Sequence, residues 1–73
     1  MSATVPKFSA AYMPHSDNVI FYADGWDMGV MRWTDRRLFV VRGSRPHLRL
    51  WDVRDAYLKD RTEPGDMKEI VLP

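Results

Sequence analysis

Arginine and tryptophan side chains gather in the middle third of this chain. Residues 32–54 hold seven arginines and two of the three tryptophans, with no lysine among them. A guanidinium group binds a carboxylate or a phosphate through two parallel hydrogen bonds and stacks on aromatic rings, whereas a lysine ammonium acts as a point charge. Arginine and tryptophan also dominate the binding energy of many protein interfaces. We therefore take this segment as the candidate binding surface.

The net charge of +1 conceals an uneven distribution. Residues 32–54 carry +5, and the flanking segments 1–31 and 55–73 carry −2 each. A basic segment with aromatic residues fits an acidic protein surface, or the phosphates and bases of a nucleic acid. The acidic flanks favour the protein, because dedicated nucleic-acid-binding domains are usually basic as a whole. We predict a protein partner and keep direct nucleic-acid binding as the alternative.

Eight residues of the segment are predicted to contact the partner. They are Arg32, Trp33, Arg36, Arg37, Arg42, Arg45, Arg49 and Trp51. For any single arginine, the simpler interpretation is a solvated charge at the end of a strand, with Trp33 in the core. The binding hypothesis requires the guanidinium groups and the indole rings to lie together on one exposed side of the folded chain.

The remaining reactive residue types form no recognisable catalytic or metal-binding pattern. The chain has no cysteine, which excludes thiolate chemistry and disulfides and fits a reducing cytoplasm. His15 and His47 lack the spacing of metal ligands. His15, Ser16 and Asp17 adjoin in sequence, so they cannot converge as the members of a catalytic triad do. We predict no enzymatic activity, no cofactor and no metal site.

The elements that must hold the basic segment begin with a β-hairpin. NVIFYA and WDMGVMRW have the composition and alternation of strands, and Asp24-Gly25 between them suits the positive φ angles of a tight turn. RLFVVR, after a turn at residues 34–36, predicts a third strand and so an antiparallel meander over residues 18–42. Gly29 inside the second run predicts a bulge or a close approach of another backbone.

The pattern changes after the meander. Val53 and Tyr57 recur at helical spacing, which predicts a helix over residues 51–61 that ends before Pro64. HLRLW, at residues 47–51, alternates like a strand, so strand and helix both remain open there. KEIVL has the composition of a returning edge strand.

Together these elements predict an α+β fold, in which one short helix packs on a small bent antiparallel sheet of three to five strands. Residues 17–73 form the single domain, and residues 1–16, which show no sustained period, form a flexible tail. No apolar run approaches the roughly 18 residues of a membrane span, and the N-terminus lacks a signal-peptide pattern. We expect a cytoplasmic monomer that does not enter membranes.

The stretch MRWTDRRLFVVRGSRPHLRLW, together with the chain length and the lack of an enzyme motif, resembles the small transcription regulators of lytic Xanthomonas phages. The resemblance covers the whole chain in size and general character. It implies binding to the N-terminal part of the β′ subunit of bacterial RNA polymerase, in the host cytoplasm. It also implies inhibition of initiation by displacement of the σ factor, and antitermination. On the residues alone, an adaptor or an antitoxin-like protein fits as well, and a structural or assembly component is a third, weaker alternative.

Overall fold

Asp24 and Gly25 form the turn of the central hairpin. Their φ angles are 51° and 84°, the left-handed values that a two-residue turn between antiparallel strands requires. The turn joins β2 (Asn18–Ala23) to β3 (Trp26–Arg32), and the two strands pair antiparallel along their length. The hairpin predicted from the sequence is confirmed.

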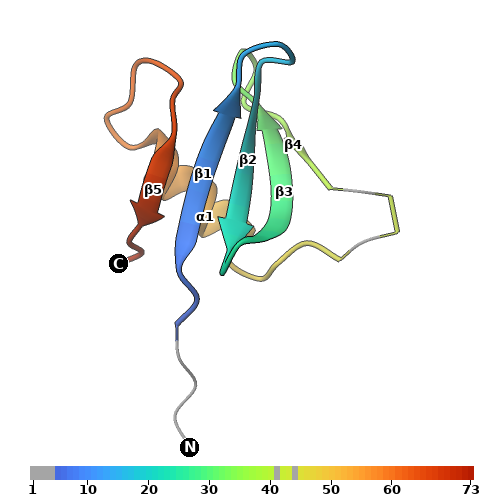
Figure 1. Cartoon of the computed structure of the whole chain (residues 1–73), viewed down its shortest axis with the longest axis vertical. Coiled ribbons are helices and arrows are strands. Elements are labelled where there is room, and N and C mark those ends of the chain that lie inside the picture. Colours follow the sequence, from blue (N-terminus) through green and yellow to red (C-terminus); the bar gives the residue numbers. More distant parts are fainter. Residues whose placement is uncertain (1–4, 41, 44) are drawn as a thin grey trace, which may run out of the picture.

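The computed structural model describes residues 5–40, 42–43 and 45–73. Within them, a five-stranded antiparallel sheet is covered on one face by one helix (Figure 1). Besides the hairpin, the elements are β1 (Phe8–Met13), β4 (Leu38–Phe39), α1 (Leu50–Leu58) and β5 (Met67–Ile70). The strand order is β4-β3-β2-β1-β5, so the short strand β4 and the C-terminal strand β5 form the edges. The predicted α+β architecture, the meander and the returning edge strand are confirmed.

Gly29 lies at a bulge in β3. The register between β2 and β3 shifts by one residue at this point, which leaves Met28 as an extra residue on β3. A Cβ atom on Gly29 would lie 3.0 Å from a methyl carbon of Leu50 and 3.2 Å from the backbone oxygen of Phe39. The sequence predicted a bulge or a close backbone approach at this glycine, and the structure has both.

Gly29→Ala should destabilise the fold by about 1–3 kcal/mol, because the added methyl group must displace the Leu50 side chain or strand β4. Gly25→Ala is the matched control, since Gly25 also has a positive φ but its Cβ would meet nothing within 4 Å. Urea unfolding followed by circular dichroism measures both changes. Equal losses would show that the backbone angle alone, and not close packing, requires a glycine at position 29.

The helix supplies one side of the core. Leu50, Val53 and Tyr57 face the sheet and have no exposed surface. Opposite them lie the buried side chains of the strands, which alternate most regularly along β2, as a sheet with one covered face requires. These are Phe8, Ala10, Val19, Phe21, Ala23, Met28, Met31 and Ile70. Tyr57 joins three parts of the fold, because its ring packs edge-on against Phe21 at 5.5 Å and its hydroxyl donates to the Gly65 carbonyl at 2.6 Å.

Strand β1 corrects the prediction of a flexible tail over residues 1–16. It lies between β2 and β5 in the sheet, and its residue Phe8 is buried in the core. A four-residue turn returns the chain directly into β2, so Pro14 marks the end of a strand and not an unstructured segment. The domain includes β1 instead of beginning at residue 17; residues 1–4 lie outside the described part of the chain.

Two predicted elements are shorter than the sequence indicated. The third strand pairs with β3 only at Leu38–Phe39, because the next partner would be Gly29, where the bulge ends regular pairing. Val41, in the predicted strand, lies outside the described residues. The helix ends at Leu58 and not near residue 61, and the backbone turns left-handed at Asp60, with φ 56°.

The sequence pattern of residues 47–51 was compatible with a strand or a helix; in the structure these residues lead into the helix. Leu48 and Arg49 form a turn, and α1 begins at Leu50. His47 organises this start: its Nδ1 accepts a hydrogen bond from the Arg49 N–H at 3.1 Å, and its carbonyl accepts one from the Leu50 N–H at 3.0 Å.

Candidate functional site

The eight predicted contact residues divide between the two ends of the sheet. Four of them lie at the turn between β3 and β4, and we call this group the turn cluster: Arg32, Trp33, Arg36 and Arg37. Three others lie before or at the start of α1: Arg45, which lines a pocket at the end of the sheet where β3 begins, Arg49 and Trp51. Arg42 is on the loop between β4 and α1, which extends from the sheet in Figure 1. Arg45 lies at the end of β3 opposite to the turn cluster, whereas α1 begins over the middle of β3, where Leu50 lies against Gly29.

Two arginines of the turn cluster lie over aromatic rings. The guanidinium carbon of Arg36 is 3.9 Å from the centre of the Trp33 ring, and that of Arg32 is 5.3 Å from the centre of the Phe39 ring. Arg32 also pairs with Asp35 at 3.2 Å. A guanidinium that stacks through its face keeps its in-plane N–H groups for hydrogen bonds to a carboxylate. The rings therefore orient these two cations without consuming their donors.

Arg36 has a left-handed backbone conformation, with φ 62°. Its N–H donates to the carbonyl of Arg32 at 2.8 Å, which closes the turn. A residue with a Cβ atom costs about 1–2 kcal/mol in this conformation, and glycine or asparagine is the usual choice. The turn thus carries an arginine in a conformation that glycine or asparagine adopts more easily.

Asp17 ties the turn cluster to the turn between β1 and β2. Its carboxylate accepts hydrogen bonds from the Thr34 N–H at 3.1 Å, from the Thr34 hydroxyl, and from the Tyr12 hydroxyl at 2.9 Å. Its backbone carbonyl accepts one from the Trp33 N–H at 2.8 Å. The hydrogen bond from the Thr34 hydroxyl is the main reason that the pKa of Asp17 lies below its ordinary value of 3.8. The hydrogen bond with Asp17 also raises the pKa of Tyr12.

The stability of the fold should therefore depend on the charge of Asp17 at acid pH. Because the folded state lowers this pKa, its contribution is present above the unfolded-state pKa and is lost as the pH falls through the folded-state value. Asp17→Asn lacks that contribution. The difference in unfolding free energy between wild type and D17N should shrink from about pH 6 to about pH 2, as measured by urea unfolding at each pH. A constant difference would contradict a role for the charge.

The residues near the start of α1 are less organised as a binding surface. Arg49 pairs with Asp52 at 2.8 Å within the first turn of the helix. Trp51 is about half exposed. Arg45 lines a shallow pocket together with the carboxylate-bearing residue Asp27. Charges of both signs are mixed at this end of the sheet, so it does not form a basic patch.

Trp26 is a candidate that the sequence analysis missed. Its side chain is 79% exposed, directly after the Asp24-Gly25 turn, and it lines the same shallow pocket as Arg45. The tight turn was the available signal, because an indole at the tip of a two-residue hairpin has little of the sheet to pack against. Trp26 precedes the basic segment, so the clustering of arginines gives no signal for it.

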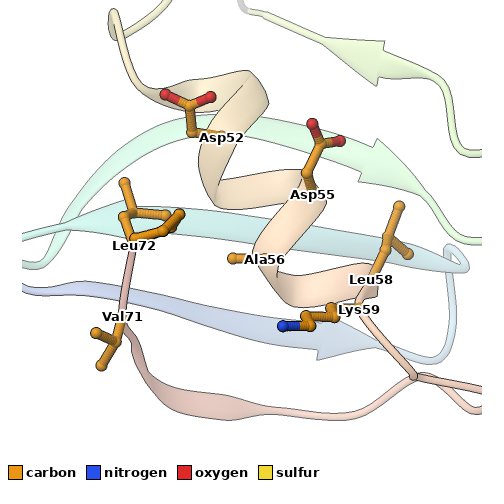
Figure 2. Close-up of a pocket in the computed structure, with 8 residues that line it drawn as sticks. Asp52, Asp55, Ala56, Leu58, Lys59, Val71 and Leu72 are labelled. Carbon is orange, nitrogen blue, oxygen red and sulfur yellow. The ribbon is translucent and has the colours of Figure 1, made fainter.

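A groove separates the outer face of α1 from the C-terminal residues (Figure 2). It is lined by Asp52, Asp55, Ala56, Leu58, Lys59, Val71, Leu72 and Pro73. Ala56 points into the space between the helix and the C-terminal segment, and the two aspartates each pair with a nearby arginine. None of the eight predicted contact residues lines the groove. Within the residues that the structure describes, His, Asp and Glu side chains form no group of three that could hold a metal ion.

Comparisons with known proteins found no matching family model, no matching curated protein and no matching solved structure. Over residues 5–40, 42–43 and 45–73, no helix has the length and apolarity needed to cross a membrane.

Proposed function

We propose that the protein is a non-enzymatic regulator that binds a protein partner through the turn cluster. The main support is the conformation of Arg36. Its backbone has the left-handed φ that favours glycine, and its guanidinium carbon lies 3.9 Å from the centre of the Trp33 ring. Arg37 adjoins it and is exposed. Neither arginine is paired with a carboxylate of the described residues. The cluster therefore offers two arginines whose donors suit acidic side chains on a partner.

The partner that we propose is bacterial RNA polymerase, as the resemblance to the small phage regulators implies. The contact is with the N-terminal part of the β′ subunit. A small domain with a rigid, charged turn can compete for a site on a large enzyme without catalysing a reaction. Competition with the σ factor inhibits initiation, and binding to the elongating enzyme promotes antitermination. On this proposal the protein acts as a monomer in the host cytoplasm.

An affinity capture experiment tests the proposal directly. The tagged chain is immobilised and exposed first to a bacterial lysate and then to purified RNA polymerase core enzyme. Recovery of the β′ subunit from both sources supports the proposal. Failure to retain the purified enzyme would remove polymerase as the partner.

Arg36→Gly separates the binding role of this residue from its role in folding. The fold should be at least as stable as the wild type, because relief of the left-handed backbone offsets the lost stacking on Trp33. Affinity for RNA polymerase should nevertheless fall about tenfold, the effect of one charge-assisted contact. Thermal unfolding and a binding titration measure the two effects. If the variant is less stable than the wild type but binds the polymerase equally tightly, Arg36 stabilises the fold and does not contribute to binding.

Direct nucleic-acid binding is the second candidate function. The exposed Trp26 side chain beside Arg45 favours it, because base stacking on an indole next to a cation is how many proteins bind single strands. Asp24 and Asp27 line the same pocket and repel phosphates, so we place it second. It predicts affinity for single-stranded RNA or DNA that falls steeply with salt. A flat titration at low salt would eliminate it.

A further inference from the structure

The backbone of the turn cluster is held in place from outside the turn. The turn closes on itself through the hydrogen bonds from the Arg36 N–H to the Arg32 carbonyl and from the Arg32 N–H to the Arg37 carbonyl, at 2.8 Å and 2.9 Å. These bonds set its internal shape but not its orientation to the rest of the sheet. Asp17 supplies that orientation, since its carbonyl and carboxylate take the N–H groups of Trp33 and Thr34, the first two residues after β3.

Asp17 is well suited to this task. It belongs to the turn between β1 and β2, which lies at the same end of the sheet as the turn cluster (Figure 1). Its carboxylate takes donors from two sides, because the Tyr12 hydroxyl also donates to it at 2.9 Å. A side chain held by β1 is thus bound to the backbone that leads into the two exposed arginines.

We propose that Asp17 is a positioning residue for the partner-binding surface, which fixes the turn cluster in its binding geometry before the partner arrives. The inference rests on the proposed function and goes beyond it by naming a residue that does not touch the partner. Preorganisation raises affinity because the ordering of the loop is completed during folding and not during association. Without the Asp17 side-chain contacts, Arg36 and Arg37 are still present, but the turn that carries them is free to move.

Asp24 provides a matched control for Asp17. Both are aspartates in left-handed turn positions, with φ angles of 51° and 56°. Both also accept a hydrogen bond from a backbone N–H, since the Asp24 carboxylate takes that of Lys7 at 2.9 Å. Asp24 lies at the opposite end of β3 from the turn cluster. Asparagine tolerates left-handed backbone angles, so Asp17→Asn and Asp24→Asn change the carboxylate and keep both turns.

The experiment compares wild type, D17N and D24N in two measurements. The first is affinity for purified Xanthomonas RNA polymerase core enzyme, and the second is amide hydrogen exchange in the free protein. We expect D17N to bind about tenfold more weakly, and D24N to stay within about twofold of the wild type. In D17N, exchange at Thr34, whose N–H donates to the Asp17 carboxylate, should accelerate by a larger factor than exchange at Val19 and Phe21, in the buried part of β2.

The outcomes separate this inference from the proposed function. Wild-type affinity for D17N would overturn the positioning role. Weak binding with exchange accelerated by the same factor at Thr34 and throughout β2 would also overturn it, since that pattern means general destabilisation. If Arg37→Glu weakens binding but D17N does not, only the inference fails. If the wild type does not bind the polymerase, or if Arg37→Glu binds as tightly as the wild type, the proposed function fails and the inference falls with it.

Discussion

Reversing the charges of Arg36 and Arg37 to glutamate should weaken binding to RNA polymerase by about 100-fold or more. Each substitution replaces a donor to partner carboxylates by a like charge, and such changes at a paired site cost about 2–5 kcal/mol, where 1.4 kcal/mol corresponds to tenfold. Both side chains are exposed, so the free energy of unfolding should change by less than about 1 kcal/mol. A binding titration with core enzyme and thermal unfolding followed by circular dichroism give the two values.

The matched control is the same charge change at the other end of the sheet, in Arg45→Glu combined with Arg49→Glu. Its net charge equals that of the turn-cluster variant, so non-specific electrostatic attraction would be weakened equally in both. We expect the control to bind within about threefold of the wild type at moderate salt, where Debye screening limits effects beyond about 10 Å. Equal losses in the two variants would contradict a localised site. If the turn-cluster variant is unfolded, Arg36 and Arg37 are needed for folding stability, and their role in binding is contradicted.

The hairpin, the bulge and the helix could be predicted because each depends on residues that are close in sequence. Asp24-Gly25 and Gly29 have backbone requirements that few other residues meet, and the spacing of Val53 and Tyr57 marks one buried face. β1 was missed because Ser9 and the two alanines after it give a weak alternation. Its place in the sheet comes from pairing with β5, as between Ala10 and Met67, and no local pattern reveals a partner so distant in sequence.

The candidate site could be predicted in composition but not in arrangement. Arginines that are neighbours in sequence were expected to be neighbours in space. An antiparallel meander works against this, because the chain leaves the turn cluster along β4 and reaches the opposite end of the sheet before Arg45. The residues that fix the turn cluster also come from elsewhere: Asp17 and Tyr57 belong to a separate turn and to the helix. A run of like charges therefore indicates a binding role without locating the surface.

Phe21→Ala should be the most damaging single substitution that we predict, with a loss of about 3–5 kcal/mol of unfolding free energy. Phe21 lies on the central strand β2, has no exposed surface, and packs against the Tyr57 ring at 5.5 Å. A domain of this size has only about 5 kcal/mol of stability in total. The variant should be largely unfolded at room temperature, as far-UV circular dichroism and urea titration would show.

Ile20→Ala is the matched control, because Ile20 is the preceding residue of the same strand and points to the uncovered face of the sheet. Its cost should be about 1 kcal/mol, since less of its surface is removed from water. Similar losses for both variants would contradict the one-sided core. The comparison also bears on binding, because Tyr57 contacts Phe21 on one side and the Trp33 ring at 6.3 Å on another. The indole on which Arg36 stacks is thus supported by the same core, so Phe21→Ala should abolish partner binding while Ile20→Ala preserves it.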